Sequence, residues 1–209
     1  MNTLFSHVCV VTMDDRMSVW TDAFVGVTDG KISYLSKHAP EEKPAQIIDA
    51  TGMVLMPGLI NCHTHLPMQL LRGYADDLKL QEWLNDYIFP REDRLDGRCV
   101  RAATTLAVAE CLKFGVTSVS DMYYFCDDIC DVIAKSGMKA NISRGTSMFL
   151  GDDFDFEKFP ACQELVALKE KWHNYDGGRI KIEASIHAEY TSTYQLWDAL
   201  SEFCINEGI

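Results

Sequence analysis

Basic residues are scarce in this sequence, and their scarcity excludes one broad class of function. The chain of 209 residues carries 19 Lys and Arg against 31 Asp and Glu, a formal net charge of -12. A protein that binds DNA or RNA through its phosphates needs a positively charged surface. We therefore expect no nucleic-acid partner.

Paired cysteines are also lacking. The chain has eight cysteines, but they are scattered and form no CxxC pair. Even the two nearest in sequence, Cys126 and Cys130, are spaced CxxxC. Most of the cysteines lie in apolar runs, which predicts reduced, buried thiols in a cytoplasmic protein.

Long apolar runs are missing as well. The longest uncharged run, Thr51–Leu71, is interrupted by Pro57, Asn61 and Pro67 and by two histidines. A membrane span needs about 20 mostly apolar residues, so we expect no membrane-spanning segment. Met1–Asp15 has neither a basic start nor a long apolar centre, and we expect no secretory signal there.

The first part of the chain, residues 1–52, has the pattern of short β-strands. Val8–Val11 and Ala23–Val27 are rich in β-branched and aromatic residues, and Asp29-Gly30 is a strong hairpin signal. The charged stretch Lys37–Pro44 is typical of a surface loop. These features predict a small β-rich unit.

The remainder, residues 53–209, alternates strands with helices. The apolar patterns predict strands at Val54–Ile60, Val116–Asp121, Lys139–Arg144 and Arg179–Ala188, and helices at Arg98–Phe114, Asp127–Ser136, Pro160–Trp172 and Ser192–Asn206. Glycines follow the predicted helices, where a left-handed residue commonly ends a helix. Strands and helices that alternate at this spacing indicate an α/β fold with a parallel sheet.

The end of the sequence repeats an earlier junction. Gly208-Ile209 has the form of Gly115-Val116 and Gly137-Met138, each of which opens a predicted strand. A complete eight-stranded α/β barrel takes about 250 residues. The chain is therefore either a small four-stranded α/β domain or the first half of a larger fold, and we favour the second interpretation.

The sharpest chemical signal is His63-Thr64-His65, directly after the predicted strand Val54–Ile60. In an extended segment residues i and i+2 point to the same side, so the two imidazoles converge. Imidazole is a common ligand of Zn²⁺, and sites in α/β folds form at the carboxyl ends of strands. The alternative is that two surface histidines fall two residues apart by chance.

The sequence around these histidines resembles a known family. Pro57–His65 is similar to the signature of the amidohydrolase superfamily, and the stretch from Leu66 to Glu92 resembles the branch of 5'-methylthioadenosine/S-adenosylhomocysteine deaminases and related chlorohydrolases. The resemblance implies an α/β fold in which a metal-dependent (β/α)8 TIM barrel carries a small β-sandwich made from both ends of the chain. Residues 53–209 would then form about four βα units, the first half of the barrel.

The resemblance also implies roles for five residues. His63 and His65 correspond to the first two metal ligands, Glu92 to a carboxylate that binds the ribose hydroxyls, and Arg144 and His187 to substrate-binding residues. From the residues alone, Glu92 could instead be a solvated acid, Arg144 an ion-paired residue at a strand end, and His187 a hydrogen-bonded core histidine.

The activity implied is the hydrolytic deamination of adenine nucleosides to their inosine analogues. The expected cofactor is one divalent metal, zinc with iron as the alternative. One ion is expected because no lysine stands at the strand end where His187 lies, as one does in the dinuclear members of the superfamily. The family's third metal histidine, its catalytic glutamate and its metal-binding aspartate belong to later strands. His7, His38 and His173 lie outside the expected site. We therefore expect the catalytic residues beyond Ile209 and no activity from this chain alone.

Two departures from the family leave the substrate open. Glu189 stands where relatives commonly have proline, and the acidic, aromatic stretch Gly151–Phe159 replaces a second arginine. Trp83 is either a wall of the base pocket or a core tryptophan. The alternatives are a chlorohydrolase or guanine-type deaminase of the same superfamily, or a non-catalytic four-stranded α/β binding module. The expected partners are a nucleoside, the C-terminal half of the barrel and further copies of the chain in a homo-oligomer.

Overall fold

The computed structural model describes residues 1–151 and 153–209, and the chain divides into two compact units. The first unit comprises Met1–Gly58 and the second Leu59–Ile209. The first unit extends past the predicted boundary between residues 52 and 53 because Val54 and Leu55 pair with its sheet.

The first unit is a mixed five-stranded sheet. Its strands are β1 (Thr3–Val11), β2 (Val19–Thr28), β3 (Lys31–Ser36), β4 (Gln46–Asp49) and β5 (Val54–Leu55). They lie in the order β3-β2-β1-β4, with β5 paired to β1. Asp29 and Gly30 connect β2 to β3 with φ values of 49° and 74°, the positive values that a tight hairpin turn requires.

The predicted single strand Val54–Ile60 is wrong, because two strands lie there. Val54-Leu55 pairs with β1, whereas β6 (Leu59–Thr64) pairs with β7 (Val116–Tyr123) in the second unit. Pro57 and Gly58 separate the two strands. Proline has no N–H to give to a ladder, so the first sheet ends before it.

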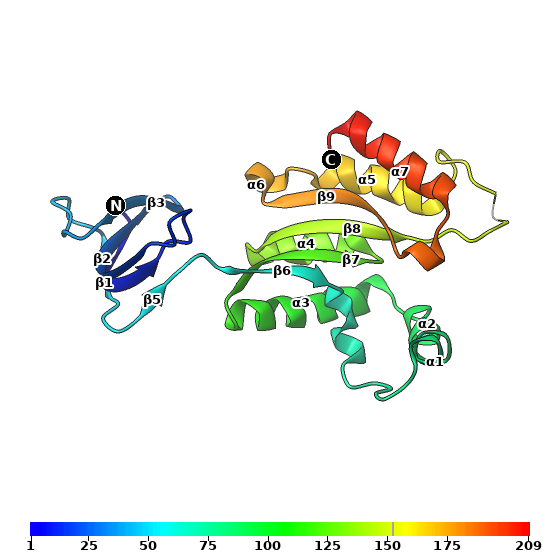
Figure 1. Cartoon of the computed structure of the whole chain (residues 1–209), viewed down its shortest axis with the longest axis horizontal. Coiled ribbons are helices and arrows are strands. Elements are labelled where there is room, and N and C mark those ends of the chain that lie inside the picture. Colours follow the sequence, from blue (N-terminus) through cyan, green and yellow to red (C-terminus); the bar gives the residue numbers. More distant parts are fainter. Residues whose placement is uncertain (152) are drawn as a thin grey trace. The chain divides into compact units, whose positions relative to one another are not determined.

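The second unit is a parallel sheet whose strands lie in the order β6-β7-β8-β9. The two remaining strands are β8 (Lys139–Thr146) and β9 (Ile180–Ile186). The long helices are α3 (Gly97–Lys113), α4 (Cys126–Ser136), α5 (Pro160–Trp172) and α7 (Tyr194–Glu207). Figure 1 shows the four strands side by side, with their carboxyl ends toward the right of the view.

Short helices fill the connections. After β6 come η1 (Leu66–Leu71), α1 (Leu80–Glu82), the π-helical turn η2 (Trp83–Ile88) and α2 (Phe89–Glu92), and the later connections hold α6 (Tyr175–Gly178) and η3 (Glu189–Thr191). In Figure 1, α1 and α2 lie near the carboxyl ends of the strands. The connection between β6 and α3 therefore supplies side chains to the end of the sheet where sites form in this fold class.

The helix boundaries follow local capping chemistry. The Asp96 side chain accepts a hydrogen bond from the Cys99 amide (2.7 Å) and caps α3. This bond lowers the pKa of Asp96. Gly137 ends α4 with φ of 79°, as the glycine positions predicted. Such end signals explain why the predicted helices agree closely with α3, α4 and α7, whereas α5 ends at Trp172 without a glycine.

Each outer strand of this sheet has one neighbouring strand among the described residues: β6 pairs with β7, and β9 with β8. Ile60 on β6 is 67% exposed. An apolar side chain on an open strand edge fits a sheet that continues with further strands. Within the part of the chain that the structure describes, no helix has both the length and the apolar character to cross a membrane.

The cysteines are less buried than the sequence predicted. Cys126, Cys130 and Cys162 are buried, Cys62 is exposed, and the other four are partly exposed; all are free thiols. Burial raises the pKa of Cys126 to about 12 and that of Cys162 to about 11. Since the thiolate is the reactive form, burial protects these sulfurs both sterically and chemically.

We expect the three buried thiols to resist alkylation in the folded protein. Iodoacetamide at mildly alkaline pH should modify Cys126, Cys130 and Cys162 at least about 100-fold more slowly in buffer than in concentrated urea. Peptide mass spectrometry over time measures the three rates. Equal rates in buffer and in urea would show that this core is open.

Arg179 lies directly before β9, at the opposite end of the sheet from α1 and α2. Its guanidinium donates hydrogen bonds to the carbonyl oxygens of Ile133 (3.3 Å), Ala134 (3.1 Å) and Met138 (3.0 Å), and its Nε donates to Asp176 (2.7 Å). The carbonyls of Ile133 and Ala134 lie in the last turn of α4, where helical carbonyls lack intrahelical donors.

Replacing this guanidinium should destabilise the second unit. Arg179→Ala removes three bonds to carbonyls, and we expect a loss of about 2–4 kcal/mol of unfolding free energy in urea titrations. Lys139→Ala, in which an exposed side chain nearby is removed, is the control and should change the stability little. An Arg179→Ala protein as stable as the control would show that water replaces the guanidinium at no cost.

Candidate active site

His63 and His65 lie at the carboxyl end of β6, and their rings meet. The ring centroids are 4.9 Å apart, with an angle of 74° between the planes. His63 belongs to β6 and His65 follows it directly, so the extended backbone places both side chains on one side. Both rings line the same cavity.

A hydrogen bond to the backbone orients His65. Its Nδ1 lies 2.6 Å from the carbonyl oxygen of Met122 on β7, and it donates its proton to this acceptor. Nε2 is then the ring nitrogen that carries a lone pair. Metal-ligating histidines are typically held in this way by their second ring nitrogen.

Asp121 on β7 holds the backbone around His65. One of its carboxylate oxygens accepts hydrogen bonds from the Leu66 amide (2.6 Å) and from the Thr64 hydroxyl (2.7 Å). The carboxyl group is buried, and burial raises its pKa to about 6 against the opposing effect of these bonds. Its second oxygen, Oδ2, is buried without a hydrogen-bond partner. Asp121 was not predicted as a site residue, although an acid inside an apolar strand is a usable signal.

Glu92 ends α2 and is partly buried. The Tyr123 hydroxyl donates a hydrogen bond of 2.5 Å to its carboxylate. Burial raises the pKa of Glu92, and the bond from Tyr123 opposes this shift. The side chain therefore lies against the strand ends and not in a solvated loop.

Arg144 lies near the carboxyl end of β8 and is paired within the protein. Its Nε donates a hydrogen bond of 2.6 Å to Glu164 on α5. The guanidinium carbon lies 4.7 Å from the centroid of the Tyr124 ring. The structure thus places Arg144 at a cavity wall and in an ion pair at the same time.

His187 follows β9 directly. Its Nδ1 donates to the Thr191 hydroxyl oxygen (2.9 Å), and this hydroxyl donates to the Ala188 carbonyl (3.1 Å). Partial burial lowers the pKa of His187, with a smaller contribution from His65. The ring is therefore neutral near physiological pH, with Nε2 as an acceptor.

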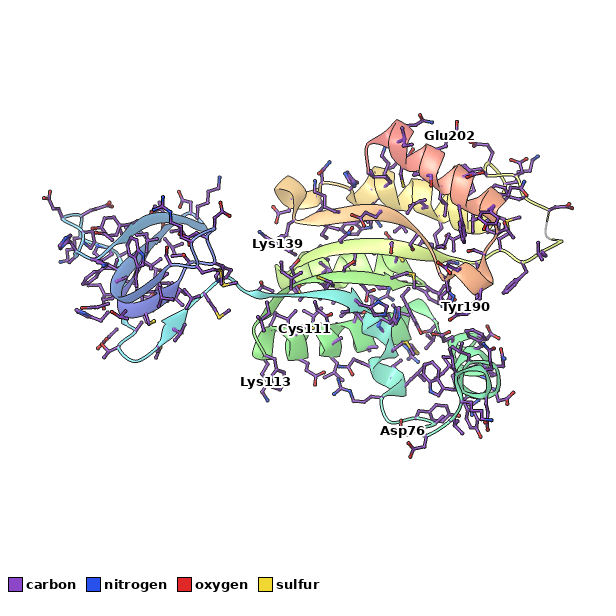
Figure 2. All side chains as sticks on the ribbon, viewed as in Figure 1. Asp76, Cys111, Lys113, Lys139, Tyr190 and Glu202 are labelled. Atoms are coloured by element: carbon purple, nitrogen blue, oxygen red, sulfur yellow. The ribbon has the colours of Figure 1, made fainter. Side chains whose placement is uncertain are left out.

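The five predicted residues line two adjoining cavities. The inner cavity, about 280 Å³, contains His63 and His65, and the outer cavity, about 870 Å³, contains Arg144. Glu92 and His187 line both. Figure 2 places Tyr190, which also lines both cavities, at the end of the sheet opposite Lys139, the first residue of β8.

The residues present fit part of a metal site. His63 and His65 supply two imidazoles on one cavity wall, and the bond to Met122 fixes His65 with Nε2 as a possible ligand atom. Among residues 1–151 and 153–209, no group of three or more His, Cys, Asp or Glu side chains is arranged to hold a metal. A catalytic zinc site normally has three protein ligands, so this chain offers two of them.

A comparison with models of protein families identifies the family of this chain. The profile of the amidohydrolase family matches residues 54–209. This match covers well over half of the sequence, and the chain belongs to the amidohydrolase family.

The curated relatives narrow the similarity to one branch. A 5-methylthioadenosine/S-adenosylhomocysteine deaminase of Thermoanaerobacter pseudethanolicus is 32% identical over 211 residues, covering 100% of this chain and 48% of its own length. One of Pelotomaculum thermopropionicum is 34% identical and covers 99% of this chain and 47% of its own length. A 5'-deoxyadenosine deaminase of Methanosarcina acetivorans is 35% identical, with 98% and 46% covered. The chain thus spans about half the length of these relatives.

Solved structures confirm the fold. An adenosine deaminase from Xanthomonas campestris with bound zinc superposes with a TM-score of 0.86 at 29% identity, covering 98% of this chain and 47% of that one. The atrazine chlorohydrolase TrzN from Arthrobacter aurescens gives 0.87 at 21% identity, with 99% and 51% covered. The predicted α/β class and the N-terminal part of an amidohydrolase barrel are therefore confirmed.

Proposed function

We propose that the complete protein is a metal-dependent deaminase of adenine nucleosides, which converts 5'-methylthioadenosine or S-adenosylhomocysteine to the inosine analogue and ammonia. The observation that carries this proposal is that His63 and His65 converge on a cavity that also contains Glu92 and His187. The names of the similar relatives support the choice of an adenine nucleoside.

His63 and His65 would hold the metal, which we propose to be zinc. The zinc in the related adenosine deaminase structure supports this choice over iron. When bound, the metal supplies the nucleophile by lowering the pKa of a water molecule. The other ligands and the proton-transferring glutamate would come from the C-terminal half of the barrel, so the 209-residue chain alone is inactive.

The inner cavity suits the adenine base. Trp83, Leu84 and Phe89 supply apolar surface for a flat ring. The His187 Nε2 is placed to accept a hydrogen bond from a substrate N–H or O–H group. These residues orient the base with its amino group toward the two histidines, and orientation alone contributes much of the rate in such reactions.

Glu92 suits the ribose. A carboxylate with raised pKa, set between the two cavities, can accept hydrogen bonds from two neighbouring hydroxyl groups. Its position puts the base on the metal side and the 5' substituent on the side of the outer cavity. Arg144 lines that outer cavity.

The test is to incubate the full-length, zinc-loaded protein with 5'-methylthioadenosine and to follow the loss of adenine absorbance and the release of ammonia. Turnover of guanine or a chlorinated triazine without turnover of the nucleoside would favour the alternative deaminase or chlorohydrolase. A protein that binds no metal and turns over none of these compounds would support a non-catalytic α/β module.

Glu92 and Tyr123 should determine the acid limb of the pH profile. Ribose binding needs the ionised carboxylate, so 1/KM should fall as the pH drops through the raised pKa of Glu92. Tyr123→Phe removes the bond that lowers this pKa, so its acid limb should move to higher pH. Glu92→Gln should raise KM about 100-fold and abolish the limb, because an amide cannot titrate.

The measurement is KM for 5'-methylthioadenosine over the acidic range. Tyr34→Phe, in the first unit, is the matched control and should leave the limb in place. If the acid limb of 1/KM is unchanged in Glu92→Gln, a group other than Glu92 produces it.

We also propose a cytoplasmic, homo-oligomeric enzyme. The free thiols of all eight cysteines support a reducing compartment. Size-exclusion chromatography with light scattering of the full-length protein tests the oligomeric state.

A further inference from the structure

We propose that the outer cavity selects adenine nucleosides whose 5' substituent carries no net negative charge, and that Glu164 is the residue that determines this preference. The inference rests on the proposed function and narrows its substrate class. It arises from how Arg144, the guanidinium in this cavity, is already bound.

The hydrogen bonds of Arg144 are largely directed into the protein. Its Nε donates to Glu164 at 2.6 Å, and one Nη donates to the Gly145 carbonyl oxygen. The Tyr124 ring covers one face of the guanidinium, with its centroid 4.7 Å from the central carbon. The arginine side chain is 18% exposed, whereas that of Glu164 is 39% exposed. A ligand entering the cavity therefore meets the carboxylate more readily than the guanidinium.

The remaining charges in this cavity are negative. Among the residues that the structure describes, Glu164, Asp93 and Glu92 line it beside Arg144. His187 adds no positive charge near physiological pH, because burial lowers its pKa. Three carboxylates against one paired guanidinium give the cavity a negative field, which opposes an anionic group.

The position of the substrate brings its 5' substituent into this field. The adenine amino group must reach His63 and His65 in the inner cavity, and the ribose hydroxyls meet Glu92, which lines both cavities. The far side of the ribose then faces the outer cavity. The methylthio group of 5'-methylthioadenosine is uncharged and fits this requirement.

The test compares three nucleosides on the full-length, zinc-loaded protein. They carry a propylthio, a 2-carboxyethylthio or a 2-aminoethylthio group at the 5' carbon, so they are similar in size and differ in charge. We expect kcat/KM to be at least about fivefold lower for the carboxylate than for the propyl compound, and no lower for the amine. Equal values for the carboxylate and propyl compounds would overturn the inference.

Glu164→Gln tests the assigned residue. The substitution frees the Arg144 guanidinium from its ion pair, and the ratio of kcat/KM for the carboxylate compound to that for the propyl compound should rise at least about fivefold. Glu170→Gln is the matched control, because Glu170 is an exposed acid on the same helix that lines neither cavity.

The outcomes separate the two proposals. If neither 5'-methylthioadenosine nor any of the three nucleosides is deaminated, the proposed function fails and the inference falls with it. If only 5'-methylthioadenosine is deaminated, only the inference is overturned. If all are deaminated and Glu164→Gln changes the ratio no more than Glu170→Gln does, only the inference is overturned. A higher salt concentration should also reduce the discrimination in the wild-type protein, since the field is electrostatic.

Discussion

His65→Ala in the full-length protein should abolish metal binding and lower kcat/KM at least about a thousandfold. The substitution removes one of the two imidazoles that meet at 4.9 Å on the wall of the inner cavity. This ring is also the one whose Nδ1 is hydrogen-bonded to the Met122 carbonyl oxygen. Metal analysis of the purified variant and the adenine absorbance assay measure the two effects.

His38→Ala is the matched control, because His38 is an exposed histidine in the first unit. It should keep the metal content and the activity of the wild type. Circular dichroism of His65→Ala would separate loss of the site from loss of the fold. A folded His65→Ala protein with full metal content would show that His65 does not hold the ion.

Asp121→Ala should destabilise the protein by about 2–5 kcal/mol and weaken zinc binding about 10- to 100-fold. The carboxylate accepts bonds from the Leu66 amide and the Thr64 hydroxyl, one on each side of His65 in sequence. In the variant, the Leu66 amide loses its buried hydrogen-bond acceptor, and the Thr64 hydroxyl loses its bond to the carboxylate. The backbone on either side of His65 is then no longer held in position. Urea unfolding and zinc titration measure the two losses.

Asp121→Asn is the informative comparison. The amide keeps one oxygen that can accept from Leu66 and Thr64, so its cost in unfolding free energy should be smaller than that of Asp121→Ala. The relative unfolding free energies of Asp121→Ala and Asp121→Asn therefore test the contribution of these hydrogen bonds. If both variants unfold at the wild-type urea concentration, the carboxylate does not support this segment.

The long helices of the second unit and its strands β7, β8 and β9 were predicted well from the sequence. The predicted helix Pro160–Trp172 coincides with α5, and the predicted strand Lys139–Arg144 lies within β8. Apolar periodicity and glycines at helix ends depend on local chemistry, which the sequence displays directly. The convergence of His63 and His65 was also predictable, because it requires only two residues in an extended segment.

Contacts between distant residues could not be predicted in this way. Asp121 supports His65 because β6 and β7 pair with Thr64 opposite Asp121, and this register is a property of the sheet. Glu164 reaches Arg144 across 20 residues of chain. The short helices between Leu66 and Glu92 are each too brief to show a periodic pattern, so their positions depend on tertiary packing.

The assignment of β5 and β6 to different sheets was not predicted, for a related reason. Val54-Leu55 and Leu59-Ile60 are all strand-forming residues, and an unbroken apolar run does not show which sheet each residue joins. Pro57 was the available sign of a break.

The position of Arg179 has a consequence for changing the substrate range of the proposed deaminase. It fastens α4 to the start of β9, whereas Arg144 and His187 lie at the opposite ends of their strands. The Arg179 anchor and the two residues proposed to face the ligand therefore occupy opposite ends of the sheet. A library that randomises only the loops after the strands, with the Arg179 anchor intact, should yield many folded members, and new specificities can be sought among them without first restoring stability.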